Sequence, residues 1–249
     1  MVSRHILGVL VFGALFPVIG LAQAGPVAQP TIWTGVFQQA EAERGARLYE
    51  VHCSRCHGPD LGGYGGVLTG ARFMERWRED NLQSLLKKLE DTMPPGPRGQ
   101  VTRPEYVDIA AYLLRMNGFP AGDNMLETAD LKGIPIVSKE GPQPVPDFSL
   151  VTVSGCLAPD GAKGWMMTDA SEPVRTRNPG ESTDAESAAA LARARAAHTF
   201  HFLDTNAFSG ELKASSWMEA KGFLMRSPGN DRINLTWLKI LKPGCDIAR

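Results

Sequence analysis

Apolar residues recur with the spacing of an amphipathic α-helix in the first half of the chain. The clearest such segment starts at a capping box over Thr102–Glu105 and carries its apolar residues on one face. Gly45 lies in another expected helix, Phe37–Val51, and its lack of a side chain would let the Thr102–Asn117 helix approach closely, with Tyr49 packing beside it. The pattern predicts helices at Phe37–Val51, Phe73–Trp77, Leu82–Leu89 and Thr102–Asn117.

From Phe148 onward the pattern changes to short alternating runs, the spacing typical of β-strands. An alanine-rich stretch, Glu186–Ala197, predicts one helix among them, and residues 227–231 predict a tight turn. Strands are expected at Val151–Val153, Trp165–Thr168, Thr199–Leu203, Ser216–Met225 and Ile233–Leu241. This set favours a small, mostly-β domain over residues 148–249, an OB-like barrel.

Residues 123–147, rich in proline and glycine, separate the two patterns and are interpreted as a linker. Contact between the two parts is then allowed but not required. The sequence therefore predicts two domains, an all-α domain at residues 36–122 and the barrel. The barrel is expected to dock a protein partner and to leave the chemistry of the first domain unaltered.

The N-terminal residues 1–24 have the pattern of a secretory signal peptide, and residues 25–35 form a short lead-in. Arg4 precedes an uncharged run of 16 residues, Ile6–Leu21, which is short for a membrane span. Ala22–Ala24 fits the small-residue cleavage pattern. The sequence predicts a periplasmic or otherwise exported protein with no stable membrane span after cleavage. An uncleaved N-terminal anchor is the alternative.

The segment Cys53–His57 reads Cys-x-x-Cys-His, the signature of covalent haem c attachment. Two thiols at this spacing add across the haem vinyl groups, and the adjacent His57 supplies one axial ligand to the iron. A redox-active cysteine pair or half of a zinc site would also contain Cys-x-x-Cys. Zinc would need a second cysteine pair at short spacing, and the remaining cysteines, Cys156 and Cys245, stand far apart. The motif therefore predicts one covalent haem c.

Two features downstream of the motif fit a haem. Six glycines between Gly58 and Gly70 predict a loop whose backbone follows the flat edge of a ligand. Met93 stands in a loop stiffened by Pro94 and Pro95, where a rigidly held thioether could serve as the second axial ligand. Met74 and Met116 are the alternatives, but both fall in helical or charged contexts.

Composition and charge narrow the classes of partner. Hydrophobic residues make up 43% of the chain, charged residues 21%, and the formal net charge is −1, so no basic surface for nucleic acid is indicated. The predicted barrel has 12 basic and 11 acidic residues and no aromatic stripe, which also argues against nucleic acid. Export makes Cys156 and Cys245, near the two ends of the barrel, the expected disulfide partners.

Residues 36–122 resemble a class I cytochrome c domain. They are similar to the single-haem subunits that accompany periplasmic quinoprotein dehydrogenases. The residues that carry the resemblance are Gly45, Tyr49, Cys53, Cys56, His57, Gly58, Leu68, Gly70, Phe73, Met93, Pro94 and the run from Ile109 to Pro120.

The resemblance implies covalent links at Cys53 and Cys56, with His57 and Met93 as axial ligands. We expect Leu68, Phe73, Trp77, Leu85 and Pro94 to line the haem crevice. Trp77 either turns its indole N–H towards a haem propionate or is a packing residue. The family usually places a proline nine or ten residues after the ligand histidine, and its carbonyl accepts the histidine ring N–H. Gly66 and Val67 stand there instead, which leaves open which carbonyl does so.

These features predict an electron carrier rather than an enzyme. It would accept electrons from a dehydrogenase, with a quinoprotein dehydrogenase as the candidate donor, and pass them to a respiratory acceptor. A haem enzyme of peroxidase type is one alternative, which would need the Met93 position vacant or labile and a distal histidine or arginine. A docking or binding protein, in which the barrel is the functional part, is the other.

Overall fold

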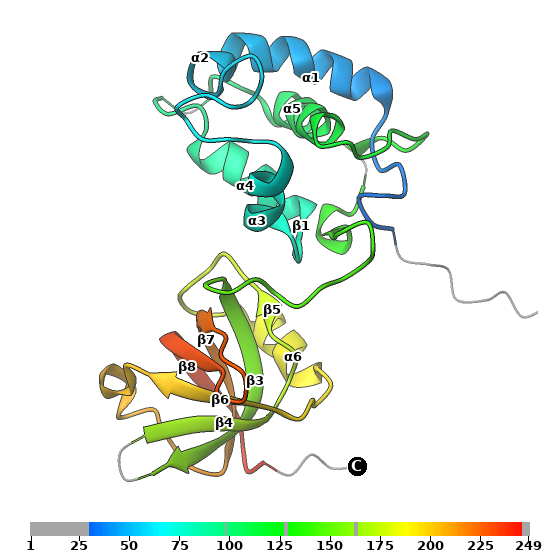
Figure 1. Cartoon of the computed structure of the whole chain (residues 1–249). Helices are drawn as coiled ribbons and strands as arrows, with labels where there is room; N and C mark the ends of the chain where they lie inside the picture. The colour runs from blue at the N-terminus through cyan, green and yellow to red at the C-terminus, as the bar shows by residue number, and fades with distance from the viewer. Residues whose placement is uncertain (1–29, 98, 127–128, 162–163, 246–249) are drawn as a thin grey trace, which may run out of the picture.

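The computed structural model describes residues 30–97, 99–126, 129–161 and 164–245. They form a helical region followed by a sheet region (Figure 1). The predicted signal peptide lies outside the described residues. No helix among the described residues has the length and apolarity needed to cross a membrane.

The helical region contains five α-helices, a short 3-10 helix and a two-stranded ribbon among its described residues. The helices are α1 (Gln39–His52), α2 (Ser54–His57), α3 (Gly70–Trp77), α4 (Leu82–Thr92) and α5 (Arg103–Met116). The remaining elements are η2 (Leu131–Gly133) and the ribbon of β1 (Asp80–Asn81) and β2 (Pro135–Ile136). The four predicted helices are confirmed, with ends shifted by a few residues.

The capping box at the start of α5 is present, with the Thr102 amide donating to the Glu105 carboxylate over 2.7 Å. This reciprocal pairing satisfies backbone donors that a helix start leaves free, and it explains why the helix begins here. Gly118 follows the helix with φ of +80°, the left-handed conformation that glycine adopts readily.

Helices α1 and α5 cross at Gly45, as the sequence predicts. A Cβ atom at Gly45 would lie 1.8 Å from the main-chain oxygen of Asp108, so only glycine allows this approach. One turn further along α1, the Tyr49 and Tyr112 rings pack with their centroids 5.1 Å apart. Arg44 closes the crossing on the solvent side through a two-pronged ion pair with Asp108, at 2.8 and 2.6 Å.

Part of the predicted linker packs into the helical region. Four of its apolar side chains belong to the same buried core as α1 and α5: Leu126, Leu131, Ile134 and Ile136. From the lead-in, Ile32 is fully buried, and the Trp33 indole N–H donates to the Val137 carbonyl over 2.9 Å. These scattered apolar residues follow neither helix nor strand spacing, so the sequence pattern gives no sign of their burial.

The sheet region is a six-stranded mixed sheet with its own buried core. The strands are β3 (Leu150–Asp160), β4 (Gly164–Ala170), β5 (Val174–Arg175), β6 (His198–Leu203), β7 (Ser216–Met225) and β8 (Arg232–Pro243). Their order is β4-β6-β8-β7-β3-β5, and β3 also pairs with β4. The pairings therefore run in a closed circuit through five strands, with β6 and β8 parallel and the other pairs antiparallel.

Helix α6 (Asp184–Ala192) packs on this sheet, and the short 3-10 helix η3 (Thr205–Phe208) follows β6. The predicted helix Glu186–Ala197 is wrong at its C-terminal end. Beyond Ala192 the chain leaves the helix because Arg193 turns to donate to the Thr152 carbonyl, and the Ala196 amide donates to the Ala170 carbonyl. Tertiary hydrogen bonds thus override the helix preference of the alanines.

The sheet region also contains the disulfide between Cys156 and Cys245, whose Cα atoms are 5.4 Å apart. His198 and His201 are paired with carboxylates, at 2.7 Å from Glu172 and 2.6 Å from Asp160. The described residues contain no group of three or more His, Cys, Asp or Glu side chains arranged to hold a metal ion.

Replacing Gly45 with alanine should lower the free energy of unfolding by about 1–3 kcal/mol, because a methyl group would meet the Asp108 carbonyl. This is the net loss, after the gain of about 1 kcal/mol in helix propensity that alanine brings. Denaturant unfolding followed by far-UV circular dichroism measures it. Gly210→Ala is the matched control, since a Cβ there would meet nothing within 4 Å. Equal stability of Gly45→Ala and wild type would contradict the close crossing.

Replacing both Cys156 and Cys245 with serine should lower the free energy of unfolding by about 4–5 kcal/mol, because the bridge closes a loop across 89 positions. Denaturant unfolding followed by tryptophan fluorescence measures the loss. Reductant should destabilise the wild type and leave the double variant unchanged. A wild type that is insensitive to reductant would show that the bridge does not form in solution.

Candidate haem site

A cavity opens between the end of α1, the loop after α2, and helices α3, α4 and α5. It encloses about 870 Å³ of empty space, counting its open mouth. Both cysteines of the motif, His57 and Met93 all line it. So do all five residues that the sequence predicts for the crevice: Leu68, Phe73, Trp77, Leu85 and Pro94.

The motif sits at a change of direction in the chain. Helix α1 ends at Cys53, whose amide donates to the Tyr49 carbonyl over 2.8 Å. The single turn α2 follows, with the Cys56 and His57 amides both donating to the Cys53 carbonyl. This tight turn places both cysteines and His57 along one side of the cavity, and neither cysteine is in a disulfide.

Burial raises the pKa of the Cys53 thiol to about 11, and the neighbouring Cys56 contributes to the rise. In the free chain Cys53 is therefore a neutral thiol at pH 7. A zinc site would require further ligands besides these two thiols. Since the described residues offer no cluster of three metal-binding side chains, the zinc alternative has no geometric support in this part of the chain.

The His57 ring is oriented by a loop carbonyl. Its Nδ1 lies 2.9 Å from the Gly66 carbonyl oxygen, which can only accept, so Nδ1 carries the proton. Nε2 is then left as the lone-pair nitrogen, the form that binds a metal. Gly66 thus fills the place that the cytochrome family usually gives to a proline carbonyl, the point that the sequence leaves open.

The glycine-rich loop reaches this position by passing very close to the motif. A Cβ at Gly65 would lie 3.0 Å from the Cys56 carbonyl oxygen and 3.1 Å from the His57 ring. The Tyr49 hydroxyl ties the start of the loop to α1 by donating to the Gly58 carbonyl over 2.7 Å. The loop backbone therefore borders the cavity, as the glycines predict.

Met93 caps the C-terminal end of α4 and lines the same cavity as the motif. Its amide donates to the Leu89 carbonyl over 3.0 Å, and its carbonyl accepts a hydrogen bond from the Tyr106 hydroxyl on α5. Pro94 and Pro95 line the cavity beside it. The alternatives Met74 and Met116 do not line the cavity. Met74 packs against the helical core, and Met116 is 41% exposed.

Sequence reasoning missed several residues of the cavity. His52, Arg76 and Lys88 bring polar groups to its lining, and Ile109 and Leu113 of α5 complete the apolar wall. Ile109 and Leu113 lie on the predicted apolar face of their helix, so that signal was present. The three polar residues lie beside apolar stripes, where spacing alone does not separate them from ordinary surface residues.

The donor set and the lining fit a haem c. Two free cysteines at the attachment spacing, a histidine with its Nε2 lone pair free, and a methionine on another wall surround a mainly apolar cavity. These residues would hold the group through two thioether bonds and two axial ligands. The basic side chains of Arg76 and Lys88 suit its carboxylates.

Comparison with known families agrees with this geometry. Residues 40–113 match a family model described as cytochrome c oxidase, cbb3-type, subunit III. Neither the curated proteins nor the solved structures gave a match. The matched stretch contains the motif, the glycine-rich loop, Met93 and the start of α5 through Leu113. Residues 40–113 are a c-type cytochrome segment.

Proposed function

We propose that this protein is an exported electron carrier with one haem c held by Cys53, Cys56, His57 and Met93. The convergence of these four side chains on one cavity supports the proposal. The matching cytochrome family supports haem-based electron transfer and redox partner proteins. The electron donor would be a dehydrogenase within an oxidoreductase complex, and a quinoprotein dehydrogenase is the candidate. The electron acceptor would be a respiratory component.

The bound group would supply a one-electron couple at its iron. His57 and Met93 would hold that group, and two hydrogen bonds of the chain orient these side chains or their backbone. The Gly66 carbonyl fixes the tautomer of His57, and the Tyr106 hydroxyl holds the backbone of Met93. Helix α1 leads into the cysteine motif and α5 carries Tyr106, and these two helices cross at Gly45. The crossing would therefore help to keep the spacing of the two ligand positions when the charge on the iron changes.

The cavity lining favours the reduced state. The ferric form carries one more positive charge than the ferrous form, and an apolar wall solvates that charge poorly. Phe73, Leu85 and Leu113 contribute to that wall. Histidine and methionine ligation acts in the same direction and raises the reduction potential.

For the sheet region we infer an OB-like barrel. Its support is the closed circuit of pairings β3-β4-β6-β8-β7, in which β6 and β8, the third and fifth of these strands in chain order, are parallel. The Cys156–Cys245 disulfide fits an oxidising compartment outside the cytoplasm, which supports export.

Met93→Ala should remove the far-red sulfur-to-iron absorption band of the ferric protein, because the thioether at the cavity wall is lost. Met74→Ala is the matched control, since Met74 lies outside the cavity lining and its loss should leave the band in place. A band that survives Met93→Ala would show that another side chain is the sixth ligand.

Carbon monoxide should not bind to the reduced native protein and should bind to Met93→Ala. The physical reason is that a six-coordinate iron has no open position, whereas removal of Met93 creates one. Visible spectra before and after gas addition measure this. Rapid binding to the native protein would favour the peroxidase-type alternative, for which His52 and Arg76 in the cavity lining would be the candidate distal residues.

A further inference from the structure

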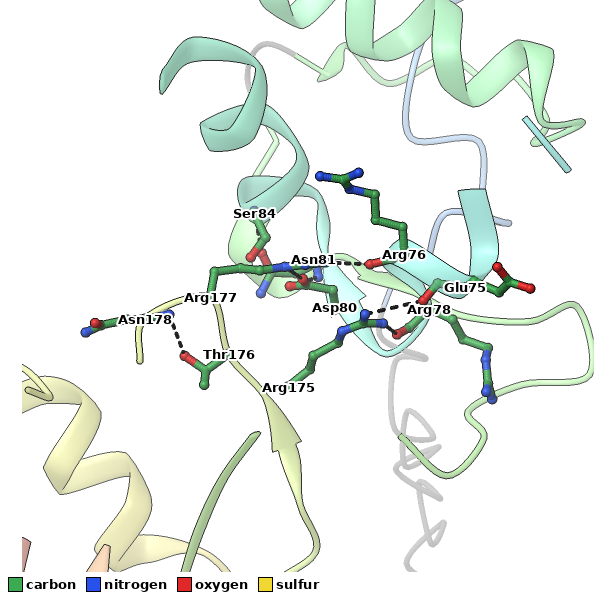
Figure 2. Close-up of polar contacts among 10 residues, drawn as sticks. All are labelled: Glu75, Arg76, Arg78, Asp80, Asn81, Ser84, Arg175, Thr176, Arg177 and Asn178. Carbon is green, nitrogen blue, oxygen red and sulfur yellow. Dashed lines mark hydrogen bonds and ion pairs between the residues drawn. The ribbon is translucent and has the colours of Figure 1, made fainter. Parts of the chain in front are cut away.

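Two arginines of the sheet region reach into the helical region. Arg175 ends strand β5, which pairs with β3 at the edge of the sheet, and Arg177 follows two positions later. Figure 2 shows both side chains extending towards the segment that leaves α3 and enters β1. The contacts join residues about 100 positions apart in the sequence.

Their hydrogen bonds fall on main-chain oxygens that close helix α3. Arg175 donates to the Arg78 carbonyl over 2.6 Å and to the Glu75 carbonyl over 3.3 Å. Arg177 donates to the Arg76 carbonyl over 2.5 Å. The last carbonyls of a helix have no partner within it, and cations near this end are stabilising. The sheet region therefore supplies the C-terminal cap of α3.

Arg177 also holds a buried carboxylate. Its Nε donates to Asp80 over 2.6 Å, and the Asp80 side chain is only 2% exposed, whereas that of Arg177 is 40% exposed. An ionised carboxylate at such a depth needs a cation and hydrogen bonds to be tolerated. The Asn81 amide supplies a further hydrogen bond to Asp80.

The same guanidinium stacks on the Trp77 ring. Its central carbon lies 4.5 Å from the centroid of the indole ring, within the range of a cation–π contact. Trp77 is 5% exposed and lines the haem cavity. Trp77 therefore has the cavity as one neighbour and an arginine of the sheet region as another.

The rest of the segment is held from the linker side. The Gln143 amide donates to the Glu79 carboxylate over 2.8 Å, and the Arg78 guanidinium donates to the Pro144 carbonyl over 3.3 Å. These contacts fix the chain after Trp77 but do not touch the indole. Among the described residues of the sheet region, Arg177 is the one whose side chain contacts both the Trp77 ring and the backbone beside it.

We propose that Arg177 is a positioning residue for the haem site: it holds Trp77 in the cavity wall, so that the sheet region sets the reduction potential. This rests on the proposed haem function and replaces the expectation that the barrel leaves the haem chemistry unaltered. A wall that closes tightly excludes water from the haem, and exclusion of water disfavours the ferric charge. Release of Trp77 admits water and lowers the potential.

The experiment measures the midpoint potential of the full-length haem protein in a double-mutant cycle of Arg177→Ala and Trp77→Leu. Arg177→Ala should lower the potential in the wild-type background. In the Trp77→Leu background the same change should have little further effect, because the side chain through which Arg177 acts is gone. Equal shifts in the two backgrounds would overturn the proposal.

Loss of charge needs its own control, because Arg177→Ala leaves the Asp80 carboxylate unpaired. The variant combining Arg177→Ala with Asp80→Asn removes both charges and should still have the lowered potential. Full recovery of the wild-type potential in this variant would show a charge effect alone and overturn the positioning role. Arg72→Ala removes a cation from the exposed face of α3, where it pairs with Glu75, and should leave the potential unchanged.

Arg177→Lys keeps the positive charge but not the planar fork that reaches Asp80 and the Arg76 carbonyl together. It should lower the potential in the same direction, and it serves as the second variant if Arg177→Ala folds poorly. If Arg177→Lys had the wild-type potential, the positive charge alone would be sufficient, and the positioning role of the planar guanidinium would be overturned.

Absorption spectra separate this proposal from the function on which it rests. A chain that binds no haem, or lacks histidine–methionine ligation, contradicts the proposed function. A chain with the expected spectrum but a potential insensitive to Arg177→Ala contradicts only the positioning role. Truncation after residue 122 would not serve, because it also removes Leu126, Leu131, Ile134 and Ile136 from the helical core.

Discussion

The crossing of α1 and α5 at Gly45 is the contact on which the haem site depends. Helix α1 ends at the cysteine motif, and α5 carries Tyr106, whose hydroxyl holds the Met93 carbonyl. The distance between His57 and Met93, the two predicted ligands, therefore depends on the point where α1 and α5 touch. That point is at Gly45, one helical turn before Tyr49. With main-chain oxygen as the neighbour at Gly45, the crossing cannot be relaxed by turning a side chain aside. The crossing therefore helps to bring a methionine after α4 and a histidine of α2 to the same cavity.

Local signals in the sequence predicted most of this part. The capping box at Thr102 and the single glycine in α1 each depend on a few neighbouring residues, and the structure confirms both. The cysteine motif is also a local signal, and its residues line one cavity. The sequence did not predict the partner of His57, because the path of a glycine-rich loop is not fixed by periodicity. Only the folded loop shows that the Gly66 carbonyl lies within 2.9 Å of the ring. The sequence also does not predict the hydrogen bond from Tyr106 to Met93, because it joins a helix to a loop whose path periodicity does not fix.

In the second half of the chain, the alternation of apolar and polar residues predicted five strands. It did not predict how these strands contact the helical region. Strand β5 has two residues, too few for any alternation to be read, and it carries the arginine that caps α3. The end of α6 was misplaced because Arg193 is used in a tertiary contact. Residues 123–147 were interpreted as a linker because prolines and glycines dominate their composition, although Leu126 and Ile136 are almost completely buried. Composition reports an average, whereas a few well-placed apolar residues decide whether a segment packs.

The composition of the chain suggests that the two parts can be separated, whereas the hydrogen bonds between them indicate that they depend on each other. Without the sheet region, the Asp80 carboxylate would lose its guanidinium partner, and the Glu75 and Arg76 carbonyls would lose their donors. A buried carboxylate without its cation is costly, so the segment would have to open to water or rearrange. Trp77 is adjacent to that segment and in the cavity wall, so a rearrangement there would change the lining of the candidate haem site. The polar contacts that join the two parts therefore connect the fold of the sheet region to the solvent exposure of the candidate haem site. They do so although no described residue of the sheet region lines the cavity.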